Sequence, residues 1–191
     1  MRHRRRSRTL GRSPSHRKAM FKNLASAIFL TERDAELDSN KPKIKGRIIT
    51  TLEKAKEIRP LVEKCITIAR HSLPHKAAAD QLNTSAERHS EAWKTWRKGE
   101  GWKKWVQAMA PVVAARRKLI QLLGSKQAVK ICLEEIGPRF SDRPGGYTRI
   151  MRLAKPRLGD AGTRAVLEFV GIHDRKVEKS QKPAFADEAA T

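Results

Sequence analysis

The chain has 191 residues, with 42 lysines and arginines against 20 aspartates and glutamates, and therefore a formal net charge of +22. A charge this far from zero points to a polyanionic partner, either a nucleic acid or an anionic membrane surface. No apolar run approaches the ~18 residues of a membrane-spanning helix, and the basic start lacks the apolar face of a helix that lies on a membrane, so the composition favours a nucleic acid.

The N-terminal segment has the highest density of positive charge, because residues 1–31 contain no acidic side chain. Six arginines fall within the first twelve residues, and an arginine guanidinium binds phosphate bidentately and stacks on bases. We therefore expect residues 1–14 to form a basic RNA-binding arm. A mitochondrial transit peptide is a competing interpretation of a start that is rich in arginine and serine. The basic side chains of this region include Arg2, His3, Arg4, Arg5, Arg6, Arg8, Arg12, His16, Arg17, Lys18 and Lys22.

Local signals predict the first regular elements. Ser13-Pro14 combines a hydroxyl cap with a proline, and apolar residues then repeat at helical spacing, which predicts a helix. Residues 32–45 lose this pattern and are expected to form a loop or a solvated helix extension. Arg47–Thr51, which is short and β-branched, predicts a strand. A helix with an apolar stripe follows, and Pro60 should either kink it or begin a second helix.

Residues 72–111 differ in character because they hold all four tryptophans of the chain. The tryptophans form two pairs, each with a spacing of three, on either side of residues 99–101, which predicts a short helical hairpin. Two uses are open, since the indoles could pack together or serve as stacking platforms for unpaired bases. We favour packing and expect a compact helical appendage away from the main RNA contacts. The tryptophans are Trp93, Trp96, Trp102 and Trp105.

The C-terminal half is expected to supply further helices and two strands. One helix ends at Gly124, and Ser125 caps the next, which Gly137-Pro138 should stop. Residues 148–153 and 165–170 alternate as strands do, and the polar residues 173–191 are expected to form a disordered tail. Helices followed by grouped strands indicate an α+β fold with one small sheet, and a core spanning residues 15–172.

Chemistry-bearing motifs are scarce. Cys65 and Cys132 sit in apolar helical patterns and are expected to be buried free thiols. His71 and His75 are four residues apart, but Pro74 between them argues against a shared helix face, so no metal site is expected. A glycine-rich phosphate loop and a serine elbow are both missing from the sequence, and we expect no enzymatic activity.

The segment from Gly137 to Ile150 contains the most specific short sequence motifs, Gly-Pro-Arg-Phe at 137–140 and Gly-Gly-Tyr-Thr-Arg at 145–149. Spacing alone is equally compatible with an ordinary turn between a helix and a strand, with solvated arginines. Further motifs are Met-Arg-His-Arg at the start, then Leu-Gly-Arg, His-Arg-Lys-Ala-Met and Thr-Thr-Leu, in that order along the chain. Together these blocks closely resemble the bacterial ribosomal protein L17 family. The resemblance begins at Met1, so we expect no transit peptide ahead of it.

The resemblance covers residues 1–30, 46–71 and 112–172, and implies a non-enzymatic structural protein of the large ribosomal subunit, near the exit of the nascent-peptide tunnel. It also implies a small three-stranded mixed sheet packed on helices. Residues 32–45 and 72–111 are then insertions. The expected partners are large-subunit ribosomal RNA and neighbouring ribosomal proteins, in the cytoplasm. We expect no cofactor, metal, membrane, small-molecule substrate or homo-oligomer.

Recognition of folded RNA uses shape, phosphates and splayed bases, because side chains rarely enter the deep major groove of A-form helices. The arm's arginines are expected to bridge phosphates of different RNA helices, and His16 and Arg17 to face phosphate at the positive end of the first helix. A second RNA face is expected from Arg139, Arg143, Tyr147 and Arg149. The alternative is a free nucleic-acid-binding protein, such as a nucleoid or regulatory factor, although the sequence lacks the arrangement of a helix-turn-helix reader.

Overall fold

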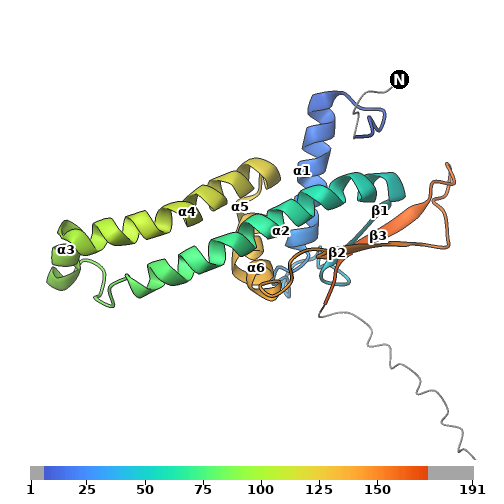
Figure 1. Ribbon diagram of the computed structural model, residues 1–191. Coiled ribbons are helices and arrows are strands. Elements are labelled where there is room, and N and C mark those ends of the chain that lie inside the picture. The colour runs from blue at the N-terminus through green and yellow to red at the C-terminus, as the bar shows by residue number, and fades with distance from the viewer. Residues whose placement is uncertain (1–6, 172–191) are drawn as a thin grey trace, which may run out of the picture.

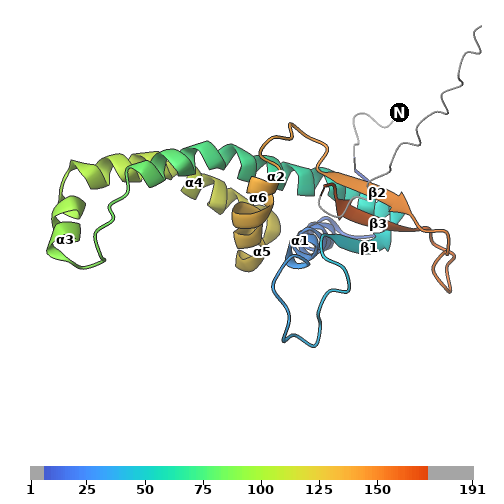
Figure 2. The same ribbon diagram turned by 90° about the horizontal axis from the view of Figure 1, so that it is seen from below.

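The computed structural model describes residues 7–171, which form an elongated α+β fold (Figure 1). The α+β prediction is confirmed. In chain order the elements are α1 (Pro14–Leu30), β1 (Arg47–Thr51), α2 (Leu52–Gln81), α3 (Glu91–Lys98), α4 (Glu100–Leu123), α5 (Lys126–Ile131), the π-helical turn η1 (Cys132–Ile136), α6 (Gly137–Arg139), β2 (Thr148–Arg152) and β3 (Arg164–Phe169). The sheet and α3 lie at opposite ends of the molecule (Figure 2).

The sheet has the order β1-β3-β2, and both pairings are antiparallel. The expectation of a mixed sheet is therefore wrong. β1 and β2 do run in the same direction, but β3 lies between them, so the described strands form no parallel pair. β3 is the central strand and is buried along nearly its whole length, which fits the sequence pattern of apolar residues on both faces.

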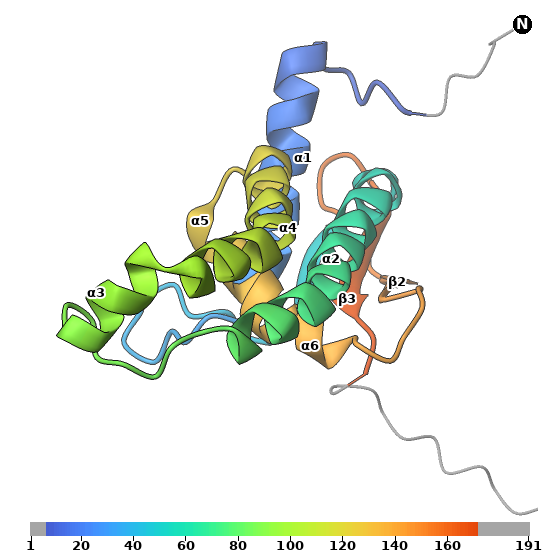
Figure 3. The ribbon, with the colours of Figure 1, turned by 60° about the vertical axis from the view of Figure 1, so that its left-hand side comes forward.

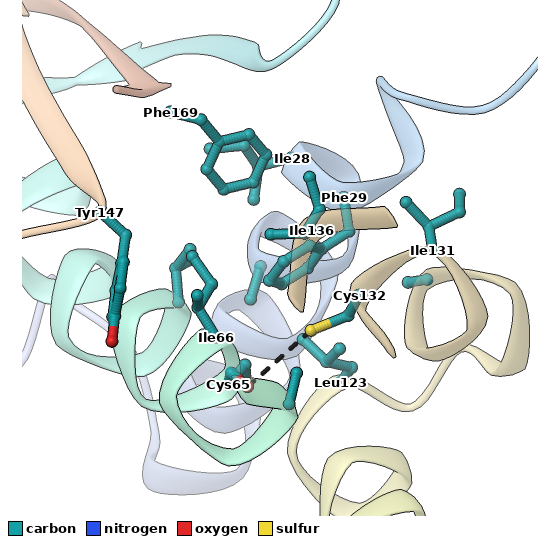
Figure 4. Packing of buried hydrophobic residues seen from close by; sticks show 14 of the residues in the cluster. Ile28, Phe29, Cys65, Ile66, Leu123, Ile131, Cys132, Ile136, Tyr147 and Phe169 are labelled. Carbon is teal, nitrogen blue, oxygen red and sulfur yellow. Dashed lines mark hydrogen bonds between the residues drawn. The ribbon is translucent and has the colours of Figure 1, made fainter. Parts of the chain in front are cut away.

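The hydrophobic core lies where α2 crosses α1, the α5–η1–α6 segment and one face of the sheet. Ile28 and Phe29 of α1 are fully buried, and the Phe29 ring packs 5.7 Å from the ring of Phe169 on β3. Ile66 of α2 and Ile136 of η1 pack in the same cluster (Figure 4). These five side chains come from four different elements, so burial of about 1.5–3 kcal/mol per side chain holds the elements to one another.

The long helices α2 and α4 lie side by side and extend well beyond the sheet (Figures 1 and 2). Residues 72–111 thus lengthen these two helices and add α3 at the tip, instead of forming a separate appendage. The helix in α2 is also continuous through Pro60 and Pro74, so the expectation of a second helix beginning at Pro60 is wrong. Both prolines, like Pro111 in α4, are exposed, so water can bind the carbonyls that lose a helical partner.

The helix after Ser125 does not stop at Gly137-Pro138. It passes through η1 and α6 and ends only at Phe140. Gly137 has ordinary helical angles and is buried, and a Cβ atom placed there would lie 3.4 Å from the Cβ of Ala69 on α2. The same Cβ atom would lie 3.3 Å from the carbonyl oxygen of Cys132, so glycine here relieves crowding both within the helical segment and against α2, and does not mark a helix end.

The two cysteines are buried free thiols, as predicted. The thiol of Cys132 donates a weak hydrogen bond to the carbonyl oxygen of Cys65, with 3.8 Å between sulfur and oxygen (Figure 4). Burial raises the pKa of Cys65 to about 12 and also raises the pKa of Cys132. Both groups are held in the neutral form inside the core.

We expect the free energy of unfolding to fall when the pH rises above about 9, because the unfolded chain can then ionise thiols that the folded chain keeps protonated. Each buried thiol makes its full contribution to the free energy of unfolding below the unfolded thiol pKa of about 8.5. That contribution should decline by about 2 kcal/mol per thiol between pH 8 and pH 10. Urea unfolding at the two pH values measures it. The Cys132→Ala variant should lose less stability over this interval than the unmodified protein, and an identical loss would contradict the thiol origin.

Candidate nucleic-acid interface

The base of the N-terminal arm is fixed to the body of the protein. The backbone N–H of Arg12 donates to the carbonyl of Thr9 (3.1 Å), and the two residues between them have positive φ values, 53° at Leu10 and 62° at Gly11. Beyond this turn, the Arg8 guanidinium lies 3.0 Å from a carboxylate oxygen of Glu57 on α2. Arg2, His3, Arg4, Arg5 and Arg6, which were predicted to bind RNA, lie outside the described residues.

The N-terminal half of α1 projects away from the core (Figures 1 and 3). The hydroxyl oxygen of Ser13 caps the helix by accepting a hydrogen bond from the His16 N–H, as the sequence predicted. The fully buried positions begin only at Ala25, and the first turn contains no acidic residue. His16 and Lys22 are exposed and Arg17 is partly exposed, so the predicted positive charges of this helix face solvent.

Lys22 also borders a shallow hollow between α1 and the turn that joins α4 to α5. The turn is set by Gly124, whose φ of 79° ends α4 in the left-handed conformation, and by Ser125, whose hydroxyl oxygen accepts from the N–H of Ala128. Two segments about 100 residues apart thus meet beside one lysine of the candidate interface.

The predicted second RNA face does not form as one group. The structure buries Tyr147, which is 1% exposed and packs its ring 5.2 Å from that of Phe140, so its ring is not available for RNA. Burial of Tyr147 therefore argues against the prediction that this residue binds RNA. Arg139 is half-enclosed and donates two hydrogen bonds to the carboxylate of Glu32, at 2.8 and 3.2 Å. Tyr147 and Arg139 therefore have structural contacts beside the glycine turn, whereas Gly145 and Gly146 themselves are exposed.

Arg143 is the exposed arginine of this loop, and it lines a surface hollow of about 600 Å³ together with Arg139 and Val170. Its guanidinium donates to the carbonyl of Gly146 (3.0 Å), and its own carbonyl accepts from the Arg70 guanidinium. Arg143 therefore keeps its predicted accessibility in a loop of defined shape.

Arg149 lies on the outer face of the sheet, opposite the helices. The register places Glu168 of β3 between Arg149 of β2 and Arg47 of β1, and Arg149 donates to the Glu168 carboxylate at 2.5 Å. Beside this row, Ile49 is 56% exposed and Met151 is 39% exposed. Arg47 was not among the predicted residues, because only the pairing of β1 with β3 brings it into the same row as Arg149.

Gly146 has a φ of 64°, a left-handed backbone conformation that favours glycine. Gly145 does not adopt this conformation, and a Cβ atom at either glycine would meet no atom within 4 Å. We expect Gly146→Val to lower the free energy of unfolding by about 1–3 kcal/mol through backbone strain. Gly145→Val is the matched control and should cost less than about 1 kcal/mol in the same urea titration. Equal losses for the two variants would contradict a strained turn.

The described part of the chain offers no other evident chemistry. His71 and His75 line one shallow hollow with Lys118 between α2 and α4, so the expectation that Pro74 separates them is wrong, since the helix continues through it. Residues 7–171 nevertheless contain no group of three or more side chains that could hold a metal ion. Within the same residues, no helix is long and apolar enough to cross a membrane.

Comparisons with known proteins match nearly the whole chain. A family model described as ribosomal protein L17 matches residues 20–170. The large ribosomal subunit protein bL17 of Rhodopirellula baltica is 62% identical over 189 residues, which are 99% of this chain and 90% of that protein. The proteins of the same name from Nitratidesulfovibrio vulgaris and Halothermothrix orenii are 36% and 34% identical, over 99% and 85% of this chain and 99% and 96% of their own lengths. The first two matches include residues 72–111.

Proposed function

This chain belongs to the ribosomal protein L17 family, and we propose that it binds large-subunit ribosomal RNA as a structural constituent of that subunit, near the exit of the nascent-peptide tunnel. The position near the exit rests on the family resemblance. The RNA contacts are assigned to the arm, residues 1–14, and to the projecting half of α1. Most of the remaining described residues form the body of the protein, from which the first half of α1 projects.

One observation carries the proposal. The first 31 residues contain no carboxylate, and the described part of this region keeps His16, Lys18 and Lys22 exposed on a half-helix that stands clear of the core. Unneutralised cations on a projecting element repel one another, and binding phosphate removes that cost while releasing condensed counterions. The N–H groups at the start of α1 add partial positive charge in the same place.

A second set of contacts is proposed for Arg143 and for the outer face of the sheet. The row of Arg47, Glu168 and Arg149 carries two arginines for one carboxylate, so it keeps a net positive charge even after the Arg149–Glu168 pair forms. Exposed Ile49 and Met151 beside this row offer apolar surface to sugars or to splayed bases. This surface would bind RNA by shape and charge without reading a linear sequence.

Sucrose-gradient fractionation of cells that contain the protein tests the proposal. We expect one copy per large subunit at high magnesium concentration, and little protein at the top of the gradient. A free nucleic-acid-binding protein would instead remain at the top or follow DNA, and would appear in substoichiometric amounts in the large-subunit fractions. That distribution would reject the ribosomal assignment.

A further inference from the structure

The tip of the α2–α4 hairpin is built around tryptophans. Trp96 of α3 packs edge-on against Trp102 of α4, with ring centroids 5.5 Å apart, and Trp102 stacks on Trp105 at 5.0 Å. A Cβ atom at Gly101 would lie 2.7 Å from the Trp96 ring, so glycine at this position is what permits the close packing. The prediction that the indoles pack together is confirmed for these three rings, which join α3 to α4.

Trp93 does not belong to that group. Its ring lies beside His89 at 5.3 Å and beneath the guanidinium of Arg97, whose central carbon is 4.9 Å from the ring centroid. The same guanidinium carbon lies 4.7 Å from the centroid of the Trp102 ring. Arg97 is therefore held between two indoles, one of which has no role in the packing of the other three.

Arg97 is exposed, and among residues 7–171 its guanidinium has no hydrogen-bond acceptor and no ion-pair partner. The nearby carboxylate of Glu91 is instead 2.7 Å from the ammonium of Lys94. Stacking on indole faces fixes the plane of a guanidinium without using its N–H groups, which point outward from the edge of that plane. The two indoles thus restrict the Arg97 guanidinium, and its N–H groups, which could bind an acceptor bidentately, have no acceptor among the described residues.

The residues around Arg97 carry an excess of positive charge, which favours an anionic partner. Residues 88–105 carry six lysines and arginines against two glutamates, and the basic ones are Arg88, Lys94, Arg97, Lys98, Lys103 and Lys104. The tip lies at the opposite end of the molecule from the sheet and well away from the projecting end of α1 (Figures 1 and 2). It can therefore reach a partner that the arm does not touch.

We propose that the tip of the hairpin is a separate RNA-binding surface, in which the indole-held Arg97 binds a backbone phosphate of ribosomal RNA. A phosphate accepts two parallel N–H bonds from the planar fork of this guanidinium, and the surrounding lysines add charge without geometric demands. An acidic protein surface could neutralise the charge only if its carboxylates were placed to meet several cations spread around the tip. An RNA backbone carries a negative charge at every nucleotide and so meets this requirement without a special arrangement. The inference rests on the proposed ribosomal location and not on the arm.

Proximity is tested first, with a probe on the tip of the full-length protein. Ala92→Cys introduces an exposed thiol on α3, whereas Cys65 and Cys132 are buried with raised pKa values and stay unreactive in the folded protein. An iron chelate attached to this thiol generates hydroxyl radicals after incorporation into large subunits. We expect cleavage of ribosomal RNA at a discrete cluster of nucleotides. Labelled subunits that show no RNA cleavage would overturn the proposal and point to a protein neighbour or to solvent.

The role of Arg97 is tested at the same nucleotides by chemical protection of their backbone in unlabelled subunits. Arg97→Lys keeps the charge but removes the planar fork, and we expect it to abolish most of the protection, as Arg97→Ala should. Lys126→Ala, an exposed cation on α5, is the matched control and should leave the protection unchanged. Full protection in Arg97→Lys subunits would overturn the assignment of the fork. Both Arg97 variants should still be incorporated into large subunits. A loss of backbone protection in these subunits therefore concerns Arg97 alone, whereas the proposed function would fail only if the protein were absent from the subunit.

Discussion

Deleting residues 2–6 should lower the salt dependence of RNA binding by about 3 units in the slope of log affinity against log salt. The segment carries four arginines, and each neutralised phosphate contributes roughly 0.7–0.9 to that slope. At low salt the same deletion should weaken binding by orders of magnitude. Filter binding or fluorescence anisotropy on a large-subunit RNA fragment, repeated over a tenfold range of potassium chloride, measures both quantities.

The deletion leaves the described base of the arm in place, including the Arg8–Glu57 ion pair, so the unfolding midpoint should not change. The matched control replaces the four arginines by lysines, which preserves charge and should preserve the slope, while affinity falls where bidentate geometry matters. An arm that acts through phosphate cannot give an unchanged slope after deletion. That result would move the RNA contacts to α1 and the sheet.

Arg139→Met should destabilise the protein by about 3 kcal/mol, because it leaves the Glu32 carboxylate buried without its partner. The Glu32 side chain is 5% exposed, and both of its oxygens accept hydrogen bonds from the Arg139 guanidinium. The pair joins the segment just after α1 to the end of α6, and its two residues are 107 positions apart in the sequence. Urea unfolding at pH 7 measures the loss.

Arg143→Met is the comparison variant, since Arg143 lies in the same segment but is exposed and pairs with no carboxylate among the described residues. It should cost less than about 1 kcal/mol of stability and lower the salt slope of RNA binding by about 0.7–0.9. The double variant Glu32→Gln with Arg139→Met should recover part of the lost stability, because the buried charge is gone. A stability loss in Arg139→Met no larger than in Arg143→Met would show that the pair is not structural.

Local signals in the sequence were sufficient for many of the element boundaries. The Ser13 cap with Pro14 predicted the start of α1, and the β-branched run at residues 47–51 predicted β1 with its observed bounds. Gly124 ends α4 in the left-handed conformation that its position suggested. These features depend on the backbone preferences of a few neighbouring residues, so they can be read without knowledge of distant contacts. The resemblance to the ribosomal protein L17 family was also evident from several short motifs in their order along the chain.

The helix ends predicted from prolines and glycines were wrong where tertiary packing outweighs the local backbone preference. Pro60 and Pro74 remain inside α2 because the helix packs along α4 and the sheet, which offsets the lost hydrogen bonds. Gly137 looks like a helix end in the sequence but lies within the helical segment, against Ala69. In each case the deciding energy comes from residues far away along the chain.

The sequence by itself determined where the positive charge is concentrated, because the net charge of +22 and the acid-free first 31 residues can be recognised without knowledge of the fold. Only the tertiary structure decided which candidate side chains are available to an anionic partner. Strand pairing places Arg47 and Arg149 on either side of Glu168, Glu32 pairs with Arg139, and the ring of Tyr147 is buried in the core. The reason is that exposure and pairing are properties of the chain's long-range contacts, whereas charge is a property of each residue alone.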